Sequence, residues 1–410
     1  MMHDVLLNQI KLEKTAVGTK VVYYFDAPAE FRRFLKEDCL FVEYPADISG
    51  CPDAVLAIPF VGIMATVTMI LHTGISVPSC DRTFIDSLRS MEGIFQSLYR
   101  SKEICISVKA AEMPYNTYSP SGNSSVFFTG GVDATSAFVA MAEKRPQLIN
   151  IQGGDVRLDD DASHAALEAY FSEFSRAVGT SFCFIRTNAR EMFEEDALGG
   201  VCEKILGHRN NHGWWASIAH ILSMTSTIAP WMWVNRISDH YIGSSYDAKL
   251  KTFDANNEKL IETLRYCSCT FHTVDNHIER NEKVRKIIEY SNATGTNVQL
   301  KVCWNRTAGC NCSACEKCYR TMMNVMINRA DPNRFGFNVD RNTLAQMREF
   351  LSSRTVSAAF WNAIQHSFRE DAAFWRGTEI AWMLDIKINS LRAYTNRVKQ
   401  IIGRKLGFHI

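Results

Sequence analysis

The sequence carries almost no excess of either charge, since 45 Lys and Arg residues against 44 Asp and Glu give a formal net charge of +1. Such a balance offers no global electrostatic argument for binding nucleic acid or a membrane, so neither partner is expected. The N-terminus, MMHDVLLNQIKLEK, lacks the layout and cleavage site of a secretion signal. Internal repeats and low-complexity tracts are also absent. We therefore expect a cytoplasmic globular protein, and its 46% apolar and 22% charged residues are ordinary for that class.

Residues 54–71 form a stretch of 18 residues without a charge. This length is at the lower limit for crossing a bilayer. The stretch also contains Pro59, Gly62 and several β-branched residues, which suit two buried strands with a bend between them. We expect the two strands rather than a membrane span.

The cysteines lack the spacing of a disulfide scaffold, although there are 13 of them. Eight are scattered through residues 39–269, and five lie within residues 303–318. Four thiolates from a turn and the start of a helix can close a tetrahedral zinc site. The favoured ligands are Cys303, Cys312, Cys315 and Cys318. A ligand set with Cys310 in place of Cys303 is a less favoured alternative. An iron–sulfur cluster is a further alternative, because spacing alone does not exclude it.

The pattern of apolar residues divides the chain into three parts. Residues 1–115 predict a small α+β domain, followed by a linker rich in Pro, Ser, Asn and Gly. Residues 124–335 alternate strands and helices, which predicts an α/β domain with a parallel sheet. Residues 340–410 have helical periodicity and predict a helical C-terminal region.

A glycine loop lies at the start of the α/β part, where the sequence reads VFFTGGVDATS. An apolar strand that enters a Gly-Gly turn and then a helix places backbone N–H groups and the helix N-terminus around one point, which favours an anion. Thr129, Thr135 and Ser136 add hydroxyl donors, and Asp133 can hold Mg²⁺. The loop has neither the Lys of a Walker A motif nor the third glycine of a Rossmann fingerprint.

Residues Thr129-Gly130-Gly131-Val132-Asp133-Ala134-Thr135 resemble the Ser-Gly-Gly-x-Asp-Ser signature of the PP-loop ATP pyrophosphatase superfamily, with Ala134 in place of the second serine. The cysteine cluster, which follows roughly 170 residues later, is similar to that of the 7-cyano-7-deazaguanine synthase family. The resemblance covers about residues 124–330. It implies an adenine nucleotide alpha hydrolase-like (HUP) fold, with the loop holding the phosphates of ATP and the cysteines holding a structural Zn²⁺.

Several further residues are weaker candidates. The resemblance implies that a basic residue, Arg280 or Lys283, approaches the phosphates; a solvated helix face with i,i+4 ion pairs is the alternative. Loops after strands supply ligand contacts at the carboxyl edge of an open α/β sheet. The candidates in such loops are Asp155, Ser244, Ser245 and Asp247. The loops that would contact the second substrate differ from those of the synthase family. The resemblance therefore supports the ATP site more strongly than the site of the second substrate.

The resemblance implies an ATP-dependent ligase that adenylates a carboxylate, releases pyrophosphate and transfers the acyl group to nitrogen. The carboxylate would belong to a 7-deazaguanine, another small molecule or a peptide, and ammonia is the expected nitrogen donor. One alternative is a PP-loop tRNA sulfurtransferase, which would need Cys183, Cys202, Cys267 or Cys269 as a persulfide carrier. Another is a nucleotide-binding module without turnover. The terminal regions would serve a homo-oligomer or a partner protein.

Overall fold

The computed structural model describes residues 4–207, 212–244, 254–303 and 310–405, with side chains up to residue 399. The chain forms two compact units. Unit 1 comprises residues 1–129 and 140–277, and unit 2 comprises residues 130–139 and 278–410. The boundaries of these units differ from those of the three parts expected from the sequence.

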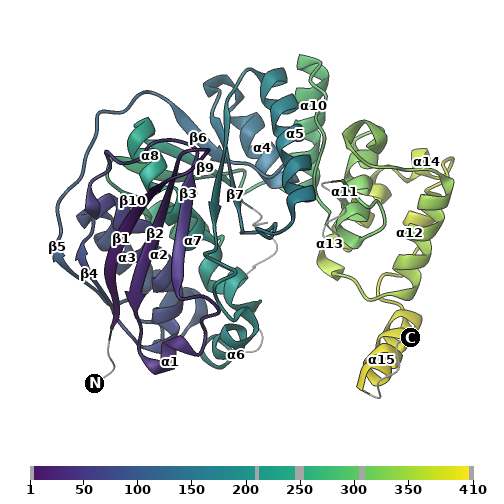
Figure 1. The fold of residues 1–410 in the computed structure, drawn as a ribbon. Coiled ribbons are helices and arrows are strands. Elements are labelled where there is room, and N and C mark those ends of the chain that lie inside the picture. Colours follow the sequence, from purple (N-terminus) through teal and green to yellow (C-terminus); the bar gives the residue numbers. More distant parts are fainter. Residues whose placement is uncertain (1–3, 208–211, 245–253, 304–309, 406–410) are drawn as a thin grey trace. The chain divides into compact units, whose positions relative to one another are not determined.

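Unit 1 contains a mostly parallel sheet, so the chain has an α/β fold (Figure 1). The strands are β1 (Val5–Lys14), β2 (Thr19–Asp26), β3 (Cys39–Tyr44), β4 (Ile75–Ser79), β5 (Val108–Glu112), β6 (Ser124–Phe127), β7 (Gln147–Gln152), β8 (Phe182–Thr187), β9 (Asp239–Gly243), β10 (Arg265–Tyr266) and β11 (Cys269–Val274). Within the described residues, 11 strands follow the order β10-β11-β9-β6-β7-β8-β3-β2-β1-β4-β5.

The parallel core runs from β11 through β9, β6 and β7 to β8, and β6 lies at its centre. The residues of β6 are all buried, as expected for a strand covered on both faces. The N-terminal strands continue this same sheet, because β3 pairs with β8 antiparallel at Val42–Thr187 and Glu43–Arg186. The expected N-terminal domain therefore does not have a sheet of its own.

The predicted pair of strands over residues 54–71 is wrong, because this segment is one helix, α2 (Asp53–Leu71). Its length and composition would allow a membrane crossing, but 94% of an 18-residue apolar stretch within it is buried inside the protein, as in a core helix. Tyr23 Oη donates to the Leu56 carbonyl at 2.9 Å, and Trp214 Nε1 donates to the Thr66 carbonyl at 3.0 Å. The helix is apolar all round because it is enclosed all round.

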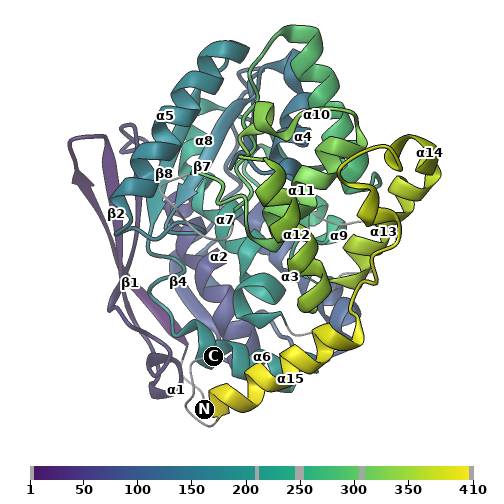
Figure 2. The same ribbon diagram turned by 90° about the vertical axis from the view of Figure 1, so that its right-hand side faces the viewer.

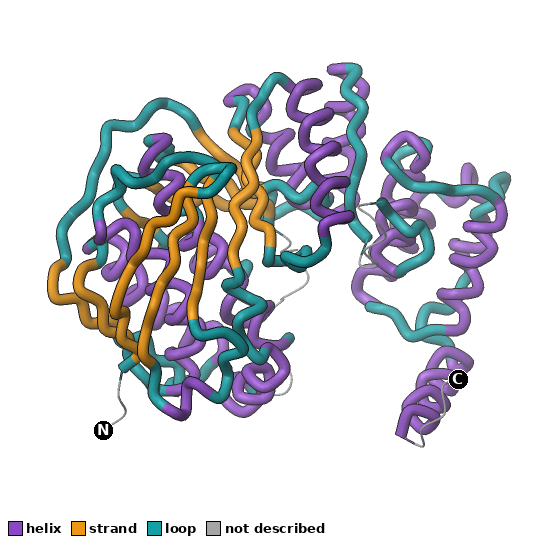
Figure 3. Tube along the Cα trace, viewed as in Figure 1, coloured by secondary structure: helices purple, strands orange, loops and turns teal. Residues whose placement is uncertain are grey.

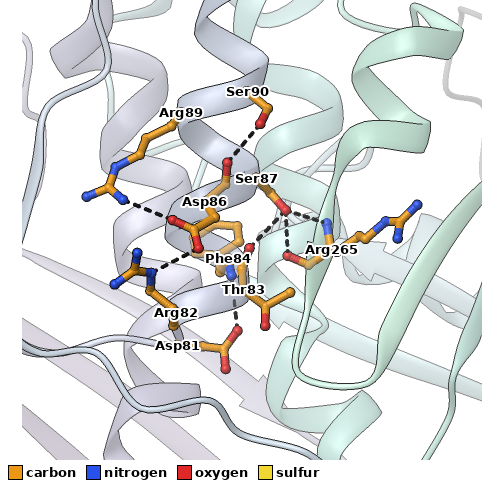
Figure 4. A network of polar contacts seen from close by, with 9 residues as sticks. All are labelled: Asp81, Arg82, Thr83, Phe84, Asp86, Ser87, Arg89, Ser90 and Arg265. Carbon is orange, nitrogen blue, oxygen red and sulfur yellow. Dashed lines mark hydrogen bonds and ion pairs between the residues drawn. The ribbon is translucent and has the colours of Figure 1, made fainter.

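Helix α3 (Arg82–Tyr99) shows how the sequence sets an element boundary. The buried carboxylate of Asp81 accepts from the Phe84 backbone N–H at 3.0 Å, which caps the helix. One turn later, the Ser87 hydroxyl donates to the Arg265 carbonyl at 3.1 Å and accepts from the Arg265 N–H at 3.0 Å (Figure 4). These bonds attach α3 to strand β10, while Asp86 pairs with Arg82 and Arg89 on the half-exposed side.

The remaining helices of unit 1 connect or cover the strands. They are α1 (Ala29–Arg32), η1 (Ala142–Lys144), α5 (Asp161–Val178), α6 (Glu195–Leu206), the π-helical turn η3 (Trp215–Ala219), α7 (His220–Thr227), α8 (Ala229–Asn235) and α9 (Glu258–Thr263). In Figure 3 the strands of this unit are orange and its helices purple.

Unit 2 contains most of α4 (Val132–Ala140) and the C-terminal helices (Figure 2). The latter are α10 (Arg280–Thr294), α11 (Glu316–Ile327), η4 (Pro332–Phe335), α12 (Arg341–Ser353), α13 (Ala358–Glu370), α14 (Ala372–Trp375), η5 (Ala381–Leu384) and α15 (Leu391–Lys405). Helix α4 packs on α10 through the rings of Phe138 and Tyr290, whose centroids are 6.2 Å apart. The helical C-terminal region expected from the sequence is present.

Candidate functional site

The glycine loop has the strand–turn–helix geometry expected of it. Strand β6 ends at Phe127, and α4 begins at Val132. Gly130 has a φ of 75°, a conformation that side chains with a Cβ rarely adopt, so glycine is required there. The Gly130 carbonyl accepts from the Lys301 N–H at 2.7 Å, which ties the turn to the segment before the cysteines.

The hydroxyl residues of the loop lie in different environments. Thr129 is exposed, whereas Thr135 and Ser136 are fully buried. Thr135 Oγ1 has no hydrogen-bond partner among the described residues. An orphaned buried donor close to a helix N-terminus suits a bound oxyanion, because the bond it lacks would be supplied by the ligand.

Two cations from α10 converge on Asp133, the acid of the loop. Lys283 Nζ lies 2.9 Å from Asp133 Oδ1, and Arg280 Nη1 lies 3.3 Å from Oδ2. The Lys283 side chain is only 2% exposed, which excludes the alternative of a solvated helix face for this residue. Arg280 and Lys283 are three positions apart and therefore share one face of the helix. Arg280 and Lys283 lie about 150 positions after Asp133 in the chain, so the fold brings these residues together.

The electrostatics of this group favour the ionised form of Asp133. Burial alone would raise the pKa of Asp133, but the charges of Arg280, Lys283 and Lys317 outweigh it and hold the pKa below its ordinary value. The Nε atom of Arg280 is also buried without a hydrogen-bond partner among the described residues. Asp133 thus stays ionised.

Sequence reasoning missed two cations of this neighbourhood, Lys317 and Arg320, which lie at the start of α11. Arg320 is 7% exposed, and its guanidinium lies 4.2 Å from the ring centroid of Phe360. Burial and the nearby charge of Arg280 lower the pKa of Arg320. The sequence contains a feature that could have identified them. Both residues lie within CEKCYR, where the candidate metal-ligand cysteines lead into a helix.

The four favoured cysteines come together as expected. The Sγ atoms of Cys303, Cys312, Cys315 and Cys318 all lie within 4.8 Å of one another. Two of the separations are 3.9 Å (Cys303–Cys315) and 4.0 Å (Cys312–Cys318). Thiolates at Zn–S distances near 2.3 Å on a tetrahedron would be about 3.8 Å apart, so the set could hold a metal such as zinc. Cys310 is exposed and lies outside the group.

The weaker candidates belong to unit 1. Asp155 follows β7, has a side chain that is 71% exposed, and lies 3.8 Å from Arg190 Nη1. Ser244 is fully buried at the end of β9, where its N–H donates to the Val274 carbonyl at 3.2 Å. Both follow the carboxyl ends of parallel strands, as predicted. Ser245 and Asp247 lie outside the described residues.

The persulfide candidates are poorly suited to that role. Cys183, Cys202 and Cys269 are buried, and burial raises the pKa of the Cys202 thiol to about 12. Burial also raises the pKa of the half-buried Cys267 thiol. A sulfur carrier must form a thiolate that reaches its partner, and these surroundings disfavour the thiolate.

Comparisons of the whole chain with family models, with curated proteins and with solved structures found no match.

Proposed function

We propose that this protein is an ATP-dependent ligase of the PP-loop class, similar to 7-cyano-7-deazaguanine synthase. The observation that carries the proposal is the convergence of Asp133, Arg280 and the buried Lys283 beside the Gly130 turn. A buried lysine is costly unless an anion accompanies it, and the N-terminus of α4 beside the Gly130 turn favours the phosphates of ATP. The cysteine set, which could hold a structural zinc, is a second and independent point of resemblance.

In this proposal, Arg280, Lys283 and the loop amides hold the β- and γ-phosphates. Both oxygens of Asp133 now accept from cations. A polyphosphate would offer those cations another partner and leave an Asp133 oxygen for Mg²⁺. A carboxylate oxygen of the second substrate attacks the α-phosphorus, and pyrophosphate leaves. A nitrogen nucleophile such as ammonia then attacks the acyl carbon, and AMP leaves. The protein contributes positioning and charge neutralisation, without a covalent nucleophile.

The first test is calorimetry of the zinc-loaded full chain with Mg·ATP. Lys283→Met keeps the length of the side chain and removes its charge, and we expect it to weaken binding about 10- to 100-fold, the range for losing one charge-assisted bond. The matched control is Arg285→Ala on the same helix, because Arg285 is 54% exposed and pairs with Glu282 and Glu289. Equal affinity in all three proteins, or no heat with the wild type, overturns the proposal.

The second test separates the ligase from its alternatives. Pyrophosphate release is measured with ammonia and a panel of carboxylates that includes a 7-carboxy-7-deazaguanine. Carboxylate-dependent release supports the ligase. Nucleotide binding without release with any carboxylate favours the module without turnover. Release that depends on tRNA and a sulfur donor favours the sulfurtransferase and contradicts the ligase.

A further inference from the structure

We propose that the C-terminal helix α15 attaches the protein to an anionic lipid membrane, lying along the surface with its apolar side in the lipid. This inference is independent of the proposed ligase chemistry and concerns where the protein is held. It follows from three features of unit 2: the concentration of positive charge toward the C-terminus, a stripe of exposed apolar residues on α15, and basic residues on both sides of that stripe.

Positive charge is concentrated in the C-terminal region. Residues 341–410 contain 11 Lys and Arg residues against 5 Asp and Glu, a formal charge of +6, so the preceding 340 residues together carry −5. Helix α15 (Leu391–Lys405) has five basic residues and no acidic residue. The near-zero charge of the whole chain conceals this asymmetry, and a basic amphipathic helix is typical of proteins that bind a membrane surface.

Three large apolar side chains form an exposed stripe on α15. Leu391, Tyr394 and Val398 are 84%, 52% and 54% exposed. They are spaced by three and four residues, so they share one face of the helix. In the sequence, Ile401 and Ile402 continue this spacing. An apolar face of this kind gains free energy by entering the boundary between headgroups and acyl chains.

The opposite side of α15 holds the helix to unit 2. Ala393 is fully buried, and Asn396 Nδ2 donates to the Ser353 carbonyl at 3.1 Å. Ser353 is the last residue of α12, and α15 lies next to that helix (Figures 1 and 2). A small and a polar side chain therefore make the attachment, while the apolar stripe points away from it.

Basic residues lie on both sides of the apolar stripe. With about 3.6 residues per turn, Arg392 and Lys399 lie on one flank and Arg397 lies on the other. Arg397 and Lys399 are exposed, and neither pairs with an acid among the described residues. Arg392 pairs with Glu349 at 2.6 Å. A flat anionic surface can thus meet cations on both flanks of the helix while it receives the stripe.

Other occupants match only part of this pattern. A second copy of α15 would bring five further cations against those of the first, and like charges repel. A nucleic acid would pair with the cations but would leave the apolar stripe in water. An anionic membrane satisfies both the charge and the apolar face, so it is the occupant that the helix favours.

The experiment measures sedimentation of the full chain with two kinds of vesicle, phosphatidylcholine alone and equal parts of phosphatidylcholine and phosphatidylserine. We expect binding to the second kind to be at least about ten-fold tighter and to weaken as salt is added, because salt screens the cations. Leu391→Gln and Val398→Gln should each weaken binding about ten-fold through lost apolar burial. Arg397→Gln and Lys399→Gln should each weaken it about five-fold, the effect of one charge near an anionic surface.

Two variants outside α15 are the matched controls. Val17→Gln removes an apolar side chain that is 61% exposed in unit 1, and Arg285→Gln removes a charge that is 54% exposed on α10. Both should bind vesicles as the wild type does. The variants of α15 are at exposed positions, so each should keep its fold, which circular dichroism checks.

Absence of binding to the anionic vesicles, equal binding to both kinds, or unchanged binding in the α15 variants overturns the proposal. A dimer that Leu391→Gln dissociates, without vesicle binding, would identify a second copy as the occupant instead. Oligonucleotide binding that Arg397→Gln weakens and Leu391→Gln does not would identify a nucleic acid instead. Binding of Mg·ATP should be the same in the α15 variants as in the wild type, so a failure of this inference and a failure of the proposed function are distinguishable.

Discussion

His240 gives the stability of the protein a specific dependence on pH. It lies in the central part of the sheet, on β9, and is completely buried. Its Nδ1 atom lies 2.8 Å from Ser125 Oγ, and its ring contacts Phe127 at a centroid distance of 4.1 Å. Nε2 has no partner among the described residues. Burial, with a smaller contribution from the charge of His272, lowers the pKa of His240 from 6.5 to about 3.

The sign of the effect follows from which state binds the proton first. As the pH falls below 6.5, the unfolded chain protonates this histidine while the folded protein does not, so stability is lost until the pH reaches about 3. The limiting slope is about 1.4 kcal/mol for each pH unit. Between pH 6.5 and 5.0 the integrated loss from this one group is about 1.6 kcal/mol. Above about pH 7.5 the group contributes almost no pH dependence, because the histidine is then neutral in both states.

The measurement is urea unfolding, followed by tryptophan fluorescence, of the wild type and of His240→Phe between pH 5.0 and 7.5. Phenylalanine keeps a ring against Phe127 but cannot titrate, so we expect the difference in unfolding free energy between the two proteins to change by about 1.6 kcal/mol between pH 6.5 and 5.0. The control is His366→Gln, because His366 is 75% exposed and meets water in both states. A difference between wild type and His240→Phe that stays constant with pH would refute the reasoning.

Three further predictions concern the loop and the thiols. The purified protein should carry about one zinc per chain by mass spectrometry of the metal, and Cys318→Ser should lose it while Cys310→Ser keeps it, because Cys310 lies outside the sulfur group. Gly130→Ala should cost about 1–2 kcal/mol in urea unfolding because the φ of 75° is unfavourable for alanine, and a cost no larger than that of Gly131→Ala would contradict this explanation. In the native protein, iodoacetamide at pH 8 should modify the exposed Cys105 and spare Cys202, whose pKa burial raises to about 12; rapid labelling of Cys202 would restore the sulfurtransferase alternative.

The parts of the site that could be predicted from the sequence are those encoded by neighbours along the chain. A glycine turn between a strand and a helix is a local pattern, and the backbone of Gly130 has the conformation that the pattern requires. The four cysteines are similarly local, because three of them lie within seven residues. In both cases a few residues that are close in the sequence must adopt one particular geometry. Their spacing in the sequence is therefore enough to predict that geometry.

The failures arise where burial, rather than local pattern, decides the outcome. Residues 54–71 contain proline, glycine and β-branched residues that favour strands, but their enclosure by unit 1 allows one apolar helix. Pro59 is accepted within it, although proline removes a backbone donor. The N-terminal strands continue the main sheet through the pairing of β3 with β8. The two paired segments are about 145 residues apart in the chain, so no local pattern predicts the contact.

The net charge of the chain likewise does not predict the local charges of the candidate site. A formal charge of +1 for 410 residues describes the long-range field of the protein and argues against a general attraction for polyanions. It carries no information about Asp133, where two cations of one helix, α10, meet a single acid of the glycine loop within hydrogen-bonding distance. Charges separated by more than about 10 Å are screened by salt, so a site of this size is governed by its own few groups. The small, highly charged ligand that we propose is therefore compatible with a chain of near-zero net charge, because its binding would depend on the few groups around Asp133.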